Sequence, residues 1–543
     1  MFLSFPMRAL LIACTTTTTG GPLFRVLREW VGSKHYAMRS INRKTTRRAR
    51  VRAPAVARKL KDPAIRRFTR SCQYPPVFTL SKQHPRRDRT RSSDNQMVDK
   101  AIKKRACYVR EMIMTLQACS PPSANLYRIA FVFFAGVLVF STASSAQTFT
   151  VLHTFTWGTD GGYPYAGLII DGEGNLYGTA NQGGDRNYLC GPANEGCGTV
   201  FELSPTNGGW GFRTLYTFQG GTNDGQGPYG RVAFGPDGAL YGTTIDGGNQ
   251  NCPSGCGLVF SLTPTGACSS TCWAEKVLYE FQGGTNDGFY PTGDLAFDSS
   301  GNVYGTTTQG VNYGPGTVYE LTPSNGQWAE TVLYSFNPNG TDAANPYSGV
   351  IFDQSGNIYG TTPGGGMNES GAVFKLTPSA NGWTESLPFA SFQGDDGVSP
   401  MAGLLLAPSG VLIGATQAGG VGNGGTIFTL TPSNGNWTFA TLYDFPGSCG
   451  DCGPYAKLIA DAKGNLYGTT QGGGEGNWGS VFKLTLTGHG WVGTVLHLFT
   501  GGADGSTPYS TLVLDSAGNI YGTTLLGGES TNGGYGVVFE ITP

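Results

Sequence analysis

Residues 347–392 read YSGVIFDQSGNIYGTTPGGGMNESGAVFKLTPSANGWTESLPFASF, and this stretch decides the fold. It contains four short apolar runs, which are YSGVIFD, NIYGTT, GAVFKLTP and WTESLPFASF. The runs are rich in Val, Ile, Phe, Tyr and Thr and are bounded by Gly, Pro, Asn and Asp, a composition typical of strands separated by turns. No long stretch has the 3.6-residue period of a helix. The sequence therefore predicts four strands and almost no helix.

Two of the connections are compact. DQSGN (353–357) joins the first run to the second, and TPSNG (322–326) joins the third to the fourth in the preceding copy. Both are turns of the Ser-Gly or Asn-Gly type, which join antiparallel neighbours. Each copy is thus expected to be a four-stranded antiparallel sheet.

This unit occurs seven times. The phrase LYGT or a variant places Ile413 in one copy and an aromatic residue in the other six, which are Tyr177, Tyr241, Tyr304, Tyr359, Tyr467 and Tyr521. A second phrase, GTVFELSP, also recurs seven times with small changes. A single sheet of so many strands would twist apart, whereas radial repetition about a channel accommodates them. We therefore predict an all-β, seven-bladed β-propeller with four antiparallel strands per blade.

The two chain ends provide a test of ring closure. The last copy ends at Pro543 after its third strand, VVFEITP, and the missing fourth strand is found at residues 147–155, QTFTVLHTF. In five copies a Trp precedes the matching Phe by eight residues, and Gln147 stands eight residues before Phe155. We predict that this N-terminal strand joins the last blade and closes the ring, which removes two open sheet edges.

The two parts of the chain carry opposite charge. Residues 1–146 hold 28 of the 36 Lys and Arg and only 6 of the 36 Asp and Glu, so residues 147–543 hold 8 basic and 30 acidic residues, a net charge of −22. Residues 1–111 lack a sustained apolar period and are predicted to be either a disordered basic tail or an over-extended gene model. The acidic charge of residues 147–543 argues against nucleic-acid binding.

Residues 112–146 have the layout of a signal peptide. Arg128 is followed by about fifteen mostly apolar residues and then by small residues up to Ala146, which predicts cleavage before Gln147. The alternative is an uncleaved anchor. Met112 or Met114 is the expected start of translation. The mature chain, residues 147–543, is therefore predicted to be secreted, periplasmic or in the cell envelope of a bacterium, without a stable membrane span and as a monomer.

The pattern GNLYGTTQGG…GSVFKLTLTGHGW…TVLHLFTGGADGSTPYSTLVLDSAGN resembles the GloVer tandem repeat of exported bacterial proteins over essentially all of residues 147–543. More distantly, the Gly-Gly doublet after the second strand and the Trp after the third resemble kelch repeats, which form propellers. The resemblance implies no established activity and no functional residues.

Eight cysteines follow residue 146 as four close pairs. These are Cys190 with Cys197, Cys252 with Cys256, Cys268 with Cys272, and Cys449 with Cys452. An even number of cysteines in an exported chain favours local disulfides. Zinc is the alternative for CPSGC followed by CSSTC, although no His lies nearby.

The long loops after strands two and four emerge on one face, which is the expected binding face. After the strand-four loop come five tyrosines, Tyr165, Tyr229, Tyr347, Tyr455 and Tyr509, with Thr292 and Met401 in the other copies. Two residues further on the copies differ, and Arg231, Asp294 and Lys457 are expected near the mouth of the channel. Tyrosines beside carboxylates suit sugar binding. The alternatives are packing of the tyrosines between blades and tolerance of any residue at the variable position.

The strand-four loop repeats an acid, at Asp160, Asp224, Asp287, Asp342, Asp396, Asp451 and Asp504. Such a ring of carboxylates could hold Ca²⁺. The simpler interpretation is that Asp-Gly makes a good turn. We expect no other cofactor.

Catalytic signatures are missing from the mature sequence. It contains no Gly-x-Ser-x-Gly elbow, no Walker loop and no dinucleotide fingerprint. The preferred interpretation is a secreted binding or scaffold protein for an extracellular glycan or protein rather than an enzyme. The alternatives are a carbohydrate-active or other hydrolytic enzyme, whose carboxylate pair the sequence does not identify, and an envelope structural protein.

Overall fold

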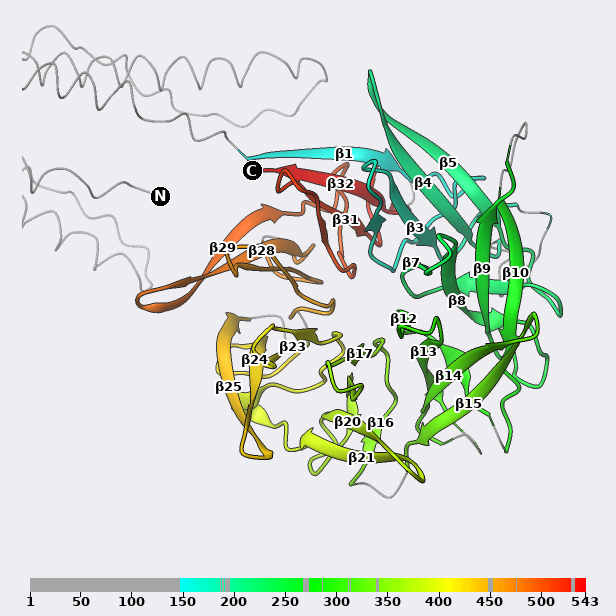
Figure 1. Cartoon of the computed structure of the whole chain (residues 1–543). Coiled ribbons are helices and arrows are strands. Elements are labelled where there is room, and N and C mark those ends of the chain that lie inside the picture. The colour runs from blue at the N-terminus through cyan, green and yellow to red at the C-terminus, as the bar shows by residue number, and fades with distance from the viewer. Residues whose placement is uncertain are drawn as a thin grey trace, which may run out of the picture. The chain divides into compact units, whose positions relative to one another are not determined.

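The computed structural model describes residues 147–543 apart from 186, 188–189, 191–195, 267–272, 286, 311, 313, 338–340, 448–452, 475 and 529–532. Seven antiparallel sheets of this region are arranged in a ring (Figure 1). The predicted seven-bladed β-propeller is confirmed. Its described residues include the 3-10 turn η3 (Gly394–Asp396) and contain no helix that could cross a membrane. Residues 1–111 and 112–146 lie outside the described range.

Each blade contributes four main strands, numbered here from the channel outward. The first strands are β2 (Ile169–Ile170), β7 (Ala233–Phe234), β12 (Ala296–Phe297), β17 (Ile351–Phe352), β22 (Leu405–Leu406), β26 (Ile459–Ala460) and β30 (Val513–Leu514), for blades 1 to 7. The second strands are β3 (Leu176–Ala180), β8 (Leu240–Gly247), β13 (Val303–Gln309), β18 (Ile358–Thr362), β23 (Leu412–Thr416), β27 (Leu466–Thr470) and β31 (Ile520–Thr524).

The two outer layers are longer. The third strands are β4 (Thr199–Thr206), β9 (Leu258–Pro264), β14 (Thr317–Ser324), β20 (Ala372–Ser379), β24 (Asn423–Ser433), β28 (Ser480–Thr487) and β32 (Val537–Thr542). The fourth strands are β5 (Gly209–Thr217), β10 (Trp273–Glu280), β15 (Gln327–Ser335), β21 (Gly382–Phe389), β25 (Asn436–Pro446), β29 (Gly490–Leu498) and β1 (Thr148–Thr154). Short extra strands follow the loops, namely β6 (Gly225–Pro228), β11 (Phe289–Pro291), β16 (Ala343–Ala344) and β19 (Gly364–Gly365).

A glycine on the second strand faces an aromatic ring on the third strand in every blade. In blade 4 a Cβ at Gly360 would lie 2.4 Å from Cζ of Phe374, which is fully buried. The Gly of the repeated phrase is therefore required by the ring across the sheet. The other pairs are Gly178 with Phe201, Gly242 with Phe260, Gly305 with Tyr319, Gly414 with Phe428, Gly468 with Phe482, and Gly522 with Phe539.

The substitution Gly360→Ala is expected to lower the free energy of unfolding by about 1–3 kcal/mol, because the added methyl group overpacks the core. Chemical denaturation of the full chain measures this loss. Gly172→Ala is the matched control, since a Cβ there meets no atom within 4 Å. Equal stability of the two variants would contradict the assignment.

The Tyr of the repeated phrase has a structural partner in the tight turn before it. In blade 4 the Asp353 carboxylate accepts hydrogen bonds from the Asn357 amide side chain at 2.7 Å and the Tyr359 hydroxyl at 3.0 Å. Burial would raise the pKa of Asp353, but these hydrogen bonds outweigh it and lower the pKa. Blade 5 has neither the Asp nor the Tyr of this contact, because Ala407 and Ile413 stand in their places. Equivalent carboxylates are Asp171, Asp298, Asp461 and Asp515.

The ring closes as predicted. Strand β1 pairs antiparallel with β32, from Thr148 opposite Thr542 to Thr154 opposite Val537. Figure 1 shows the cyan N-terminal strand beside the red C-terminal one. Phe155, only 1% exposed, packs in a core cluster of blades 7 and 1, and its backbone N–H donates to the Gly536 carbonyl at 3.1 Å. The last blade is thus held by both ends of the chain.

Two of the predicted disulfides lie within the described residues and are confirmed. Cys190 is bonded to Cys197, and Cys252 is bonded to Cys256. Because the second bond uses both thiols of CPSGC, this pair is not a zinc ligand set. Cys268, Cys272, Cys449 and Cys452 lie outside the described residues.

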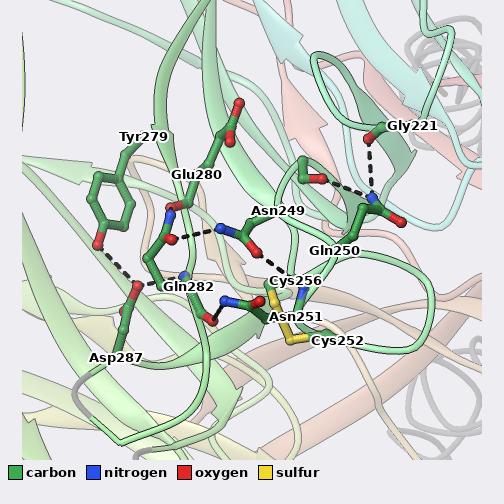
Figure 2. The surroundings of a disulfide bond; sticks show 11 residues. Gly221, Asn249, Gln250, Asn251, Cys252, Cys256, Tyr279, Glu280, Gln282 and Asp287 are labelled. Carbon is green, nitrogen blue, oxygen red and sulfur yellow. Dashed lines mark hydrogen bonds between the residues drawn. A yellow bond between two sulfur atoms is a disulfide. The ribbon is translucent and has the colours of Figure 1, made fainter.

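Figure 2 shows the loop that contains the second disulfide and its hydrogen bonds to two other loops. The Asn251 amide donates to the Gln282 carbonyl of the same blade at 3.1 Å, and the Gln250 amide donates to the Gly221 carbonyl of blade 1 at 3.3 Å. The long loops of adjacent blades are therefore connected on the predicted binding face.

Neighbouring blades also meet through paired side chains of their fourth strands. Three of these contacts are stacked rings, with centroid distances of 3.8 Å for His497 on Phe149, 3.9 Å for His153 on Phe212 and 4.2 Å for Phe389 on Phe439. Stacking of this kind adds to the burial of apolar surface between blades.

At three consecutive contacts, from blade 1 to blade 4, a Glu takes the place of the second ring and lies beside an Asp. Asp224, Asp287 and Asp342 each accept a hydrogen bond from a Tyr of their own blade, and Glu275, Glu330 and Glu385 of the next blade lie beside them. Burial, together with the neighbouring Asp, raises the pKa of Glu275 to about 7 and those of Glu330 and Glu385 to about 8. These glutamates therefore hold a proton at mildly acidic pH.

The contact between blades 5 and 6 has neither arrangement. Gly493 stands where the other blades have Phe or Glu, opposite Tyr443, and a cavity of about 230 Å³ remains there. Val495 and Leu498 line it and are half exposed. The missing side chain thus accounts for the cavity.

Candidate functional site: the central channel

All eight predicted binding residues line one cavity in the channel. Its volume is about 330 Å³, and its wall comes from the segments that lead into the first strand of each blade. The residues are Tyr165, Tyr229, Tyr347, Tyr455, Tyr509, Arg231, Asp294 and Lys457. Thr292 and Met401, which replace the tyrosine in blades 3 and 5, line the same cavity. The structure therefore brings together the residues that the repeat placed at equivalent positions.

Four of the tyrosines form a continuous cluster. Ring centroids lie 4.9 Å apart for Tyr229 and Tyr165, 5.9 Å for Tyr165 and Tyr509, and 4.6 Å for Tyr509 and Tyr455. The Tyr229 hydroxyl donates a hydrogen bond to Tyr455, which joins blades 2 and 6. Burial raises the pKa of Tyr455 to about 12, so it is neutral at physiological pH. The four rings thus pack between neighbouring blades where these face the channel, as the packing alternative predicts.

Tyr347 differs from the other four. The residue is 36% exposed, and no ring contact ties it to the tyrosine cluster in the described structure. It lies on the side of the cavity formed by blades 3 to 5, beside Thr292, whose hydroxyl donates to the Tyr347 carbonyl at 3.2 Å. This ring is therefore available to a ligand in the cavity.

The charged residues form a second layer, two residues further along each chain segment and so deeper from the long-loop face. Arg231 and Asp294 of adjacent blades make an ion pair, with Nε 3.2 Å from Oδ2. The backbone N–H of Arg231 also donates to Oδ1 of Asp294 at 3.0 Å. Both carboxylate oxygens are thus engaged, and the guanidinium is held facing the cavity.

Lys457 enters this layer from blade 6. Burial lowers the pKa of Lys457, the Arg231 charge lowers it further, and Asp294 opposes these effects. Among the described residues, Lys457 forms no ion pair within 4.0 Å. The layer therefore contains two cations and one anion.

Three blades have a glycine at the position that Arg231, Asp294 and Lys457 take in three other blades, namely Gly167, Gly349 and Gly403. In two of these blades close backbone contact requires the glycine. A Cβ at Gly349 would lie 2.1 Å from the Asp294 carbonyl oxygen, and one at Gly167 would lie 2.3 Å from that of Thr511. The first strands are therefore drawn tightly together around the charged layer. The variable position is not uniformly tolerant of other residues.

The sequence matches the Gloeobacter/Verrucomicrobia repeat over residues 135–298, 191–405 and 296–539. The chain belongs to this repeat family. The Gloeobacter/Verrucomicrobia repeat thus includes the segments that build the channel, and this agrees with the resemblance inferred from the sequence. Together with the disulfides, membership is compatible with an extracellular protein.

No curated protein matches this Gloeobacter/Verrucomicrobia repeat chain significantly. Among solved structures, it is similar to a protein from Bacteroides uniformis assigned as a 6-phosphogluconolactonase, with 15% identity, a TM-score of 0.38, and coverage of 62% of this chain and 84% of that one. A protein of unknown function from Dyadobacter fermentans has 11% identity and a TM-score of 0.36, with coverage of 73% and 98%. These similarities carry no argument about activity.

The repeated acid of the family's strand-four loop has internal partners. Asp287 accepts from the Tyr279 hydroxyl at 2.9 Å and from the Gln282 backbone N–H at 2.7 Å (Figure 2). The loops of blades 1 and 3 are built alike around Asp224 and Asp342. His153 and His497 take the Tyr position beside Asp160 and Asp504. These contacts support the turn interpretation of the acids. No group of three potential metal ligands occurs among the described residues, and Asp451 is not described.

Proposed function

We propose that this protein is an exported binding protein that holds a saccharide in its central channel. The observation that carries the proposal is the cavity of about 330 Å³, in which an exposed Tyr347 ring lies in the same wall as Arg231, Asp294 and Lys457. Aromatic rings stack on the apolar faces of sugars, while charged and hydroxyl groups bond to their hydroxyls. The volume lies within the range of small-ligand sites.

Rigidity supports the same function. Each blade packs against two neighbouring blades, and β1 closes the ring. On the long-loop face, the loop that contains the Cys252–Cys256 disulfide is bonded to the adjacent blade. A preformed cavity binds with little loss of conformational entropy. Export would place such a site among extracellular glycans.

A glycan array probed with the full chain tests the proposal. The variant Tyr347→Ala is expected to weaken binding of the selected saccharide about tenfold, because it removes the exposed stacking surface. Trp478→Ala is the matched control, since this aromatic residue is 41% exposed and does not line the channel. Loss of binding in both variants, or in neither, would contradict the channel as the site.

A further inference from the structure

We propose that the saccharide held in the channel carries a single carboxylate, which Lys457 and Arg231 bind. This inference rests on the proposed function and adds the chemical class of the ligand. It follows from the charges of the deeper layer and from the partners that those charges already have.

Both carboxylate oxygens of Asp294 contact Arg231. Its Oδ2 faces Nε of Arg231 at 3.2 Å, and its Oδ1 accepts from the Arg231 backbone N–H at 3.0 Å. Because only Nε of the guanidinium is used in this ion pair, the Nη groups remain for a ligand. Asp294 therefore orients Arg231 and only partly offsets the charge of Lys457.

Lys457 is a partly buried cation beside a second cation. The cost of this arrangement is visible as a lowered pKa, whose causes are burial and then Arg231. An anion that reaches the ammonium and the guanidinium together removes both costs, and charge-assisted hydrogen bonds of this kind are strong. Lys457 and Arg231 together therefore favour binding of an anionic group in the cavity.

The placement of these cations is exceptional in an acidic domain. Residues 147–543 contain 8 basic residues and carry a net charge of −22, yet two of the eight meet in the channel. Other cations have roles in the blades: Arg213 pairs with Glu202, and Lys375 lies over the Tyr359 ring. The cavity wall thus has a net positive charge although the domain as a whole is acidic.

The charge balance selects a monoanion. Two cations and one carboxylate leave one net positive charge in the layer, which a single carboxylate neutralises and a phosphate or sulfate-rich group exceeds. The exposed ring of Tyr347 lies in the same cavity but nearer to the long-loop face. A sugar ring stacked there directs a carboxylate substituent toward the deeper cations, as in a uronic acid.

Calorimetric titration of the full chain with methyl glucuronide, its methyl ester and methyl glucoside tests this assignment. The free acid is expected to bind at least about tenfold more tightly than either neutral sugar, which is the size of a charge-assisted hydrogen bond. Lys457→Met is expected to remove this preference and to lower the affinity for the free acid much more than the affinity for the neutral sugars. Lys463→Met is the matched control, because this exposed lysine lies in a turn of the same blade.

The outcomes separate the two proposals. Equal binding of the acid and the neutral sugars would overturn the carboxylate while the channel still binds a saccharide. Tighter binding of glucose 6-phosphate than of the glucuronide would also overturn it in favour of a dianion. If none of the sugars bound to a folded chain, the proposed function would fall together with this inference. A preference that survives in Lys457→Met would exclude the assigned residue.

Discussion

Deletion of residues 147–155 is expected to abolish cooperative folding of the propeller. These residues supply the whole fourth strand of blade 7, so the deletion exposes β32 as an open edge and removes the buried Phe155. It also removes Phe149, whose ring stacks on His497 of blade 6. Loss of a buried Phe alone costs about 3–5 kcal/mol, a large part of the stability of a typical domain. Circular dichroism during thermal unfolding measures the effect.

A rearranged chain provides the control. Residues 147–155 are removed from their place and attached after Pro543 through Ser-Asn-Gly-Gln, which reproduces the sequence TPSNGQ of residues 322–327 in blade 3 and puts Gln147 in the place of Trp328. Since β32 and β1 are antiparallel neighbours, the added turn joins them as β14 and β15 are joined. This variant should regain most of the stability. A deletion variant that unfolds like the intact chain would show that β1 does not close the ring.

Raising the pH from about 5 to about 9 is expected to reduce the free energy of unfolding through the three acid pairs. The pKa values of Glu275, Glu330 and Glu385 are about 7, 8 and 8 in the folded chain, whereas an unfolded Glu titrates near about 4.3. Between these values the folded state binds more protons, so unfolding becomes easier as the pH rises. Partial exposure reduces the effect to roughly 1 kcal/mol per pair. Denaturant titrations at several pH values measure the slope.

Replacing the three glutamates with glutamine removes their titration while keeping the neutral, hydrogen-bonding form. The triple variant should therefore be the more stable protein at pH 9 and should show a flatter pH dependence than the natural chain. Lys457 and the low-pKa aspartates titrate in both proteins, so their contributions cancel in the difference. Glu173→Gln, in an exposed turn, is the control. Parallel pH profiles of the natural chain and the triple variant would contradict the acid-pair assignment.

Local features made most of the fold predictable from sequence. The four apolar runs, the turns and the sevenfold phrase predicted the blades. The eight-residue spacing from Gln147 to Phe155 predicted that the N-terminal strand closes the ring. The Tyr359–Asp353 link was also available, because blade 5 lacks both partners and has Ala407 and Ile413 instead. That joint loss identifies the tyrosine of the repeated phrase as part of a turn.

The site was predictable only in part. Position in the repeat identified the channel residues, and the structure brings them together around one cavity. Position in the repeat did not reveal that Arg231 binds Asp294 or that Tyr229 reaches Tyr455, because these contacts depend on the spacing and tilt of whole blades. The pairing of Asp287 with Glu330 is hidden for the same reason, since each acid belongs to a separate copy of the repeat.

The fourth-strand contacts also limit how such a ring can evolve. His497 and His153 each stack on a Phe of the next blade, whereas the tyrosines beside Asp224, Asp287 and Asp342 face a Glu. A blade copied by gene duplication into a new position would place a Tyr–Asp pair against a Phe, or a His–Asp pair against a Glu. Recombination between copies should therefore be tolerated mainly where donor and recipient share the same contact type. The order of the blades is inherited as a unit, although each blade has nearly the same fold.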